Sequence, residues 1–323
     1  MEGVLGIVVP SVVGLGFLYA GGEALVRGAS ALARRSGISP LAIGLTVVAF
    51  GTSSPELAVS IEAALAGASD VSVGNVVGSN IANVTLILGS AAVLRPCVAK
   101  AKIVRVDAPL VVLASVVLVF LLADGTVGRA EGAALAGALA VYTAFTLREA
   151  KSEPPSVQEE FSPLAASRRS GVLPAAALSV LGLFLLFSGG HLFVQGSVAL
   201  ARWAGVSEAV VGLTVVAVGT SLPELAATAV ASFRGRSDLA LGNVLGSNLF
   251  NILGVLGLSA LARPLRPQGI SWADLGAMVF LASLAAVFVG TGLRVGRFEG
   301  VLLLACFCAY WGWLWLGGGT VPA

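Results

Sequence analysis

Charged residues are scarce in this sequence. They make up 11% of the 323 residues, whereas soluble domains carry about 25%, and the mean hydropathy is +0.97. Continuous apolar runs of about 20 residues fill the chain, which favours membrane-spanning helices over the alternating segments of a membrane barrel. The net charge of +2 gives no reason to expect a nucleic-acid partner. The sequence therefore predicts an all-α integral membrane protein surrounded by the lipid bilayer, with no cofactor and no obligatory protein partner.

Histidine and cysteine are also rare. The single histidine, His191, lies beside a Gly-Gly pair, where a helix-end role is favoured over proton sensing. Cys97, Cys306 and Cys308 have no spacing typical of a metal or redox site, and the last two point to different sides of a helix, so no disulfide is expected. No basic segment precedes the first apolar run, which we interpret as a retained span and not a cleaved signal.

Ten apolar segments are separated by charged residues, glycine or proline. The predicted spans are about 4–33, 40–66, 71–94, 104–123, 129–148, 171–203, 208–233, 238–262, 271–291 and 297–316. Spans five and six are joined by residues 149–170, a polar, proline-rich stretch that is too short for a regulatory domain. Helix capping is the expected role of Asp107 and Asp274, which lie near the starts of spans four and nine.

The two halves of the chain repeat one another at an offset of 168 residues. The stretch GLTVVAFGTSSPELA, residues 44–58, recurs as GLTVVAVGTSLPELA, residues 212–226, with 13 of 15 positions identical. GNVVGSNIAN from Gly74 recurs as GNVLGSNLFN from Gly242. The sequence therefore predicts a first five-helix repeat in residues 1–148 and a second in residues 171–323. Five spans per repeat invert the second repeat in the membrane, the plan of many secondary transporters.

Basic residues are distributed unequally between alternate loops. If the N-terminus is outside, the inside loops hold fourteen Lys and Arg residues and the outside loops hold four. The positive-inside rule then puts both termini outside and the linker 149–170 in the cytoplasm. The predicted location is the cell membrane, the inner membrane in a cell with two.

Each long repeated stretch carries a glutamate, Glu56 or Glu224, in the middle of an apolar span. An uncompensated carboxylate at that depth costs about 3 kcal/mol on insertion scales, so it indicates a functional site. Pro55 and Pro223 should kink or open each helix and free backbone carbonyls. Hydroxyl groups surround the break, and imidazole and thiolate are absent from the motifs. This oxygen-rich set favours a hard cation such as Ca²⁺ or Na⁺.

The second pair of motifs places polar side chains along one face of the neighbouring helix. Asn75, Ser79 and Asn83 are spaced i, i+4 and i+8, and the other repeat has the same spacing from Asn243. For Asn75, Asn80, Asn243 and Asn248, hydrogen bonding between helices and ion ligation are both open. For Ser79, Asn83, Ser247 and Asn251 the ligand interpretation is favoured.

With GTSxPE and GNxxGSNxxN in both halves, the chain resembles the cation/Ca²⁺ exchanger superfamily and looks like a prokaryotic sodium/calcium exchanger. The resemblance covers all ten spans and implies midplane ion sites formed by spans two, three, seven and eight. It implies that Glu56 and Glu224, with Thr52 and Thr220, bind Ca²⁺. The implied flanking Na⁺ sites use Ser53, Ser79 and the Ala49 carbonyl on one side, with Ser221, Ser247 and the Ala217 carbonyl on the other. Asn83 takes the central position, and Asn251 stands where the family often has aspartate.

Charge arithmetic favours obligatory exchange. Two ionised glutamates are neutralised by one Ca²⁺, whereas the empty site would leave two charges in the membrane. The predicted function is Na⁺/Ca²⁺ antiport by alternating access, electrogenic if three Na⁺ replace one Ca²⁺, as the resemblance implies. Antiport of H⁺ and Ca²⁺ on the same glutamates is the alternative, and a passive Ca²⁺ channel is a further one. An intramembrane hydrolase is disfavoured because no His or Lys base lies near the motifs, so no enzyme is predicted.

Overall fold

A computed structural model describes residues 2–36, 40–151, 171–203 and 217–314. In chain order, the elements before the linker are α1 (Glu2–Ser36), α2 (Pro40–Ile43), the π-helical turn η1 (Gly44–Val48), α3 (Ala49–Thr52), α4 (Ser54–Ala66), α5 (Ser69–Ala82), η2 (Asn83–Ile87), α6 (Leu88–Leu94), strand β1 (Cys97–Val98), η3 (Ile103–Asp107), α7 (Ala108–Leu121) and α8 (Arg129–Lys151). Those after it are α10 (Val172–Trp203), α12 (Ala217–Thr220), α13 (Leu222–Phe233), α14 (Ser237–Leu249), η6 (Phe250–Leu256), α15 (Gly257–Ala262), α16 (Trp272–Gly292), β2 (Arg294–Val295) and α17 (Arg297–Trp313).

Five continuous helical stretches are long and apolar enough to cross a membrane. Within the described residues they are Ser69–Leu94, Ile103–Leu121, Arg129–Glu149, Ser237–Ala262 and Trp272–Gly292. Their bounds lie within two residues of five predicted spans. The predicted span 208–233 lies partly outside the described residues, and the span 40–66 is divided into several shorter helices.

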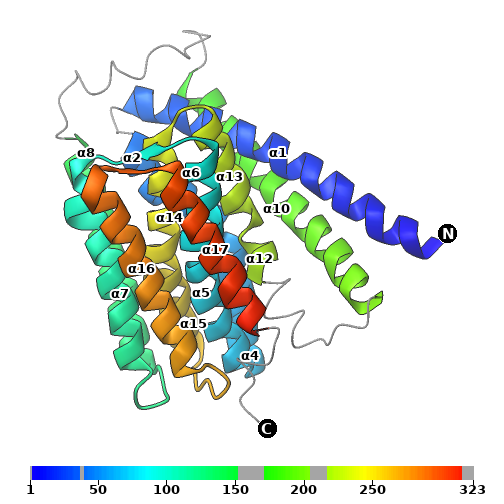
Figure 1. The fold of residues 1–323 in the computed structure, drawn as a ribbon, viewed down its shortest axis with the longest axis vertical. Helices are drawn as coiled ribbons and strands as arrows, with labels where there is room; N and C mark the ends of the chain where they lie inside the picture. Colours follow the sequence, from blue (N-terminus) through cyan, green and yellow to red (C-terminus); the bar gives the residue numbers. More distant parts are fainter. Residues whose placement is uncertain (1, 37–39, 152–170, 204–216, 315–323) are drawn as a thin grey trace.

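The helices of the bundle run roughly parallel to one another, while α1 and α10 form a separate pair that diverges from it (Figure 1). Close backbone contact holds the pair together. A Cβ at Gly21 would lie 2.7 Å from the Leu186 backbone nitrogen, and one at Gly182 would lie 2.5 Å from that of Leu25. Because Gly14 of α1 meets Gly189, further along α10, the two helices are antiparallel.

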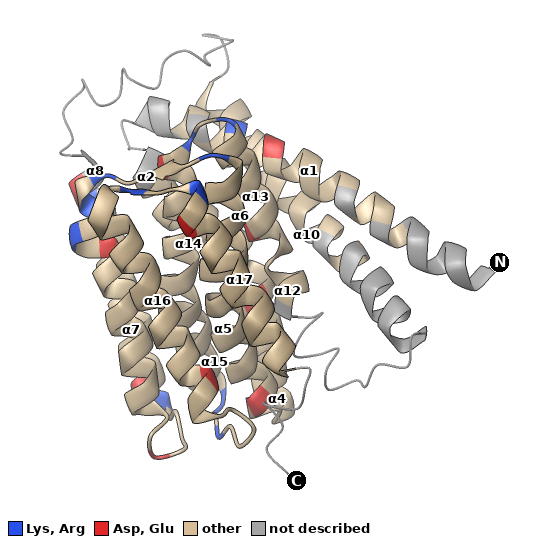
Figure 2. Cartoon of the chain, viewed as in Figure 1, with Lys and Arg blue, Asp and Glu red and all other residues tan. Residues whose placement is uncertain are grey.

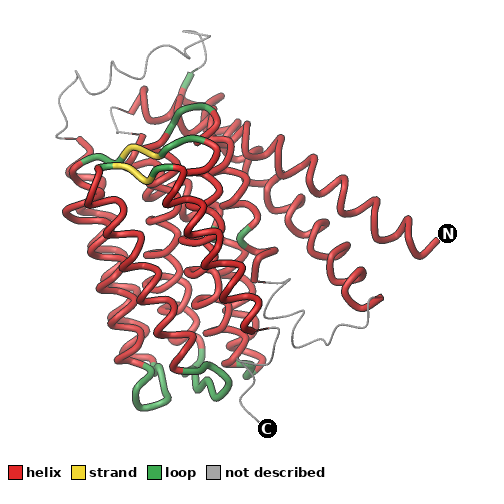
Figure 3. The backbone as a smooth tube through the Cα atoms, viewed as in Figure 1, coloured by secondary structure: helices red, strands yellow, loops and turns green. Residues whose placement is uncertain are grey.

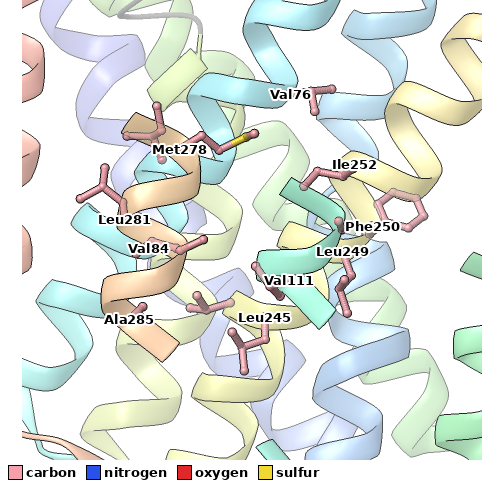
Figure 4. Close-up of a cluster of buried hydrophobic side chains, with 14 of the residues drawn as sticks. Val76, Val84, Val111, Leu245, Leu249, Phe250, Ile252, Met278, Leu281 and Ala285 are labelled. Atoms are coloured by element: carbon pink, nitrogen blue, oxygen red, sulfur yellow. The ribbon is translucent and has the colours of Figure 1, made fainter. Parts of the chain in front are cut away.

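The main hydrophobic core lies among α5, α7, α14 and α16. Figure 4 shows Val76 and Val84 facing the same interior as Leu245, Leu249 and the α16 side chains. All these residues are at most 5% exposed. The core therefore surrounds α5 and α14, the helices that carry the second repeated motif, and fixes their position.

The two ends of the bundle differ in charge and in loop structure. At one end β1 pairs with β2 in antiparallel register, Cys97 opposite Val295, which joins the loops before η3 and α17 (Figure 3). Lys and Arg residues gather at that end, with fewer at the other (Figure 2). At the opposite end Val127 and Leu265 form an isolated antiparallel β-bridge.

Burial raises the pKa of the Cys97 thiol to about 11, so this thiol stays protonated at neutral pH.

Candidate functional site: a buried pair of glutamates

Each glutamate lies in the first turn of a helix that begins at a break in the chain. Between α3 and α4, Ser53 leaves helical geometry with φ −85° and ψ 9°, and Ser221 does the same between α12 and α13 with φ −86° and ψ 4°. A proline follows in the first two positions of α4 and α13, where a missing backbone N–H is tolerated. The predicted opening of both helices at their prolines is confirmed. It places the glutamates at positive helix ends, which favour negative charge.

The two breaks meet, and each donates a hydroxyl to the glutamate of the other. Ser53 Oγ donates to Glu224 Oε1 at 2.6 Å, and Ser221 Oγ donates to Glu56 Oε1 at 3.0 Å. The four residues are equivalent in pairs at the offset of 168, so the two hydrogen bonds form a reciprocal exchange between the halves. One carboxylate site is therefore assembled from segments far apart in the sequence.

The second oxygen of each carboxylate has a different environment. Glu56 is 0% exposed and Glu224 is 1% exposed. Oε2 of each glutamate receives no hydrogen bond from the part of the chain that the structure describes. Two buried anionic oxygens without donors, close enough for the carboxylates to interact electrostatically, are suited to a cation.

A second layer of hydrogen bonds surrounds the carboxylates. Thr220 Oγ1 donates to Asn75 Oδ1 at 3.3 Å, and Thr52 Oγ1 lies 3.2 Å from Asn243 Oδ1. Thr52 also reaches the carbonyl oxygen of Val48 in its own segment, at 3.1 Å. The predicted threonines are therefore at the site, and each is joined to an asparagine of the opposite half.

The remaining predicted ligands line the neighbouring helices. Ser79 Oγ lies 3.2 Å from Ser221 Oγ, which joins hydroxyls expected in the two different Na⁺ sites. Ser247 is fully buried and lies beside Glu224. Asn83 donates to Asn248 Oδ1 at 3.0 Å, whereas neither polar atom of the Asn251 side chain has a hydrogen-bond partner within the described ranges.

Asn83 and Asn251 also share a feature that the sequence did not predict. Asn83 begins the π-helical turn η2, and Asn251 is the second residue of the π-helical turn η6. Such turns are frequent at functional sites, because the wider turn changes the direction in which nearby side chains point. A π-helical turn contains one residue more than an α-helical turn, and the spacing of apolar residues in these two stretches does not show where that residue lies.

Two predicted ligands are backbone carbonyls. Ala49 is buried, and its carbonyl oxygen already accepts the backbone N–H of Ser53 at 3.0 Å. A carbonyl oxygen has two lone pairs, so this bond leaves one for an ion. Ala217 begins α12, and its side chain is outside what the structure describes.

Ser60 and Thr228 were missed as site residues. They bind the amides of Asn75 and Asn243 at 3.0 and 2.8 Å. The available signal was their equivalence at the offset of 168, which places a hydroxyl at the same position of each half.

One predicted helix cap is confirmed and the other is wrong. Asp274 accepts from the backbone N–H of Ser271 at the start of α16, as a capping residue does. Asp107 makes no side-chain cap of α7. Its carboxylate is instead buried between Lys102 Nζ at 3.0 Å and the Tyr142 hydroxyl at 3.1 Å, because η3 turns it into the protein.

The fold and the site together define a class: a multi-pass helical membrane protein with two buried carboxylates on interrupted helices inside the bundle, an arrangement typical of secondary transporters. The family model for "sodium/calcium exchanger protein" matches residues 7–148 and 174–316. The chain belongs to this family, within the cation/Ca²⁺ exchanger superfamily, and the predicted resemblance is confirmed.

Curated relatives match the chain over nearly its full length. The putative antiporter CaxA of Alkalimonas amylolytica is 38% identical over 308 residues, covering 92% of this chain and 95% of the relative. The inner membrane protein YrbG of Escherichia coli is 38% identical, covering 93% and 94%. The sodium/calcium exchanger MaX1 of Methanosarcina acetivorans is 35% identical, covering 92% and 95%. These names describe membrane proteins or transporters, which agrees with a role other than that of an enzyme.

Solved structures of the sodium-calcium exchanger NCX_Mj have the same fold. One, soaked with 100 mM Na⁺ and 10 mM Sr²⁺, has a TM-score of 0.83 at 29% identity and covers 95% of this chain and 97% of that one. Another, soaked with zero Na⁺ and Ca²⁺, has a TM-score of 0.82 at 29% identity and covers 96% and 99%.

Proposed function

We propose that this protein is a secondary antiporter that exchanges Na⁺ for Ca²⁺ across the cell membrane by alternating access. The observation that carries the proposal is the reciprocal bonding of Ser53 to Glu224 and of Ser221 to Glu56. It brings two carboxylates together, each with one oxygen that no described group donates to. The names of MaX1 and NCX_Mj support Na⁺ and Ca²⁺ as the transported ions.

The charge of the site explains why transport would be an exchange. Glu56 and Glu224 together carry two negative charges, which one Ca²⁺ neutralises. Each uncompensated charge at membrane depth costs about 3 kcal/mol, so the protein changes its accessible side with cations bound and not with the ionised site empty. With three Na⁺ for one Ca²⁺, one positive charge moves per cycle, and each 100 mV contributes about 2.3 kcal/mol.

The ligands of the proposed site come from both motifs. Glu56, Glu224 and the oxygens of Thr52 and Thr220 would bind Ca²⁺. The additional positions would be Ser53, Ser79, Ser221, Ser247, Asn83, Asn251 and the carbonyls of Ala49 and Ala217. The contact between Ser79 and Ser221 supports placing these two hydroxyls at the same ion. Asn251, buried and without a hydrogen-bond partner in the described residues, is suited to face the centre of the site.

We further propose that ten spans form two inverted five-helix halves, residues 1–148 and 171–323, joined by the linker 149–170. The antiparallel contact of α1 with α10, the first long helix of each half, supports inversion. The loops that pair through β1 and β2 are both predicted inside, and those joined by Val127 and Leu265 are both predicted outside. The family match divides the chain at nearly the same place.

The proposed topology has both termini outside and the linker in the cytoplasm. An epitope tag inserted in residues 149–170 should be inaccessible to an impermeant reagent on intact cells and accessible after permeabilisation. Labelling of the tag on intact cells would contradict this topology.

Flux from Ca²⁺-loaded proteoliposomes tests the transported ions. An inward Na⁺ gradient at equal pH should drive Ca²⁺ release, and a pH gradient without Na⁺ should not. Release driven only by the pH gradient would favour the alternative, H⁺/Ca²⁺ antiport on the same glutamates. Release with no counter-ion outside would favour a channel.

A further inference from the structure

We propose that Asn75 and Asn243 are positioning residues that set the separation between the two halves of the ion site and thereby its selectivity for cation size. This inference rests on the proposed cation exchange. Neither asparagine is counted among the ion ligands. Both are more than nine-tenths buried, at 6% and 1% exposed.

The amide of Asn75 joins three elements. Its Nδ2 donates to the backbone carbonyl oxygen of Glu56 at 3.2 Å and to Ser60 Oγ at 3.0 Å, both in α4. Its Oδ1 accepts from Thr220 Oγ1 of α12 at 3.3 Å. Asn75 itself belongs to α5, so one side chain ties the first turn of one motif helix to the break in the other.

Asn243 repeats this arrangement in the other direction. Its Nδ2 donates to the carbonyl oxygen of Glu224 at 3.4 Å and to Thr228 Oγ1 at 2.8 Å. Its Oδ1 lies 3.2 Å from Thr52 Oγ1. Both glutamates are thus tied, through an asparagine, to the threonine of the opposite half.

The orientation of each amide follows from its partners. An asparagine has two N–H donors and one carbonyl acceptor. In Asn75 both donors are used within its own half, by Glu56 and Ser60, which leaves Oδ1 for Thr220. A flipped amide would turn Oδ1 toward the Glu56 carbonyl oxygen, which can only accept, so this hydrogen bond fixes the orientation of the amide.

The length of this tie bears on selectivity because it joins groups that would contact the ion. Selectivity among hard divalent cations depends on cavity size, ligand number and rigidity. Without the Asn75 amide, no side chain links the Glu56 backbone to the Thr220 hydroxyl, and the distance between these two groups can increase. The loss should therefore penalise Ca²⁺ more than the larger ions Sr²⁺ and Ba²⁺.

Exchange of Ca²⁺, Sr²⁺ and Ba²⁺ by full-length protein in proteoliposomes tests this inference. In Asn75→Ala and Asn243→Ala, we expect the KM for Ca²⁺ to rise about threefold to tenfold, as for the loss of one or two hydrogen bonds. The KM for Ba²⁺ should rise by a smaller factor than the KM for Ca²⁺, so the preference for Ca²⁺ over Ba²⁺ should fall, with the maximal rate largely kept. Ser115→Ala is the control, because that buried hydroxyl lies on α7 and donates to the Val111 carbonyl oxygen of its own helix at 2.8 Å.

A double-mutant cycle identifies the partner. Asn75→Ala combined with Thr220→Val should lose less Ca²⁺ preference than the product of the two single effects, because the two substitutions remove the same hydrogen bond. In Asn75→Ala combined with Thr52→Val, the loss of Ca²⁺ preference should equal the product of the two single effects, because Thr52 contacts Asn243 and not Asn75. Equal coupling in both combinations would overturn the proposed tie.

The outcomes separate this inference from the proposed function. If the wild type exchanges no cation, the proposed function fails. If it exchanges Ca²⁺ for Na⁺ and the variants reduce all three divalent cations equally, the asparagines are merely structural and the inference fails. Should the alanine variants not fold, Ser60→Ala and Thr228→Val remove only one anchor of each amide. They should shift the preference in the same direction, by about twofold; an unchanged preference would contradict the inference.

Discussion

Replacing Glu56 by glutamine should abolish Ca²⁺ exchange while leaving the protein folded. The amide oxygen of the new side chain can still accept from Ser221, so the hydrogen bond of 3.0 Å that locates this side chain is retained. The NH₂ group then takes the place of Oε2, the oxygen that receives no hydrogen bond from the described residues. An N–H group cannot ligate a cation.

The expected size of the effect follows from charge. With one glutamate removed, each loaded state carries one more net positive charge than in the wild type: one instead of none with a bound Ca²⁺, and two instead of one with three bound Na⁺. At about 3 kcal/mol per charge, this corresponds to a loss of roughly a hundredfold or more in exchange. Stability should be unchanged or higher, because the variant removes one of two buried carboxylates that repel each other.

The assay is Na⁺-driven uptake of radioactive Ca²⁺ into proteoliposomes, with the thermal unfolding of the purified protein measured in parallel. Glu62→Gln is the matched control, since Glu62 lies on the same helix, undergoes the same chemical change and is exposed. It should exchange like the wild type. Wild-type exchange by Glu56→Gln would refute the paired-carboxylate site, and so would equal losses in the two variants.

Three further substitutions test other parts of the structure. Asn251→Asp adds a third carboxylate to the site, and its Ca²⁺ exchange should become more dependent on pH than that of the wild type; an unchanged pH profile would show that this side chain does not face the ions. Gly67→Ala should lower the unfolding temperature at a cost of about 1 kcal/mol, because φ is +86°, whereas Gly137→Ala, in open space on α8, should not. Lys102→Met leaves the Asp107 carboxylate buried without its cation and should destabilise by about 3 kcal/mol, which Asp107→Asn in the same protein should largely restore; additive losses would argue against the ion pair.

The repeated motifs predicted the centre of the site because their chemistry is local. An ionisable residue at Glu56, a proline before it and hydroxyls around it recur in one short stretch, and the second copy named Glu224 as its partner. The structure brings the two copies together, since each serine donates a hydrogen bond to the glutamate of the other copy. The offset of 168 residues was the strongest single signal in the sequence.

What could not be predicted depends on contacts between elements. From the sequence, Asn75 was equally compatible with ion ligation and with helix packing. Its role depends on hydrogen bonds with Ser60 and Thr220, which come close to it only in the folded chain. Asp107 looked like a helix cap, yet Tyr142, 35 residues away, and the turn η3 draw it into the interior. Pairwise geometry of this kind leaves no periodic signal in an apolar sequence.

The most direct test of the central claim is equilibrium binding of radioactive Ca²⁺ to the purified protein and to the double variant Glu56→Gln/Glu224→Gln. A single site shared by two carboxylates predicts one bound Ca²⁺ per wild-type chain, displaced by Na⁺, and no such binding by the folded double variant. A Na⁺-displaceable Ca²⁺ that the double variant still binds with wild-type affinity would contradict the claim that these two glutamates form the site.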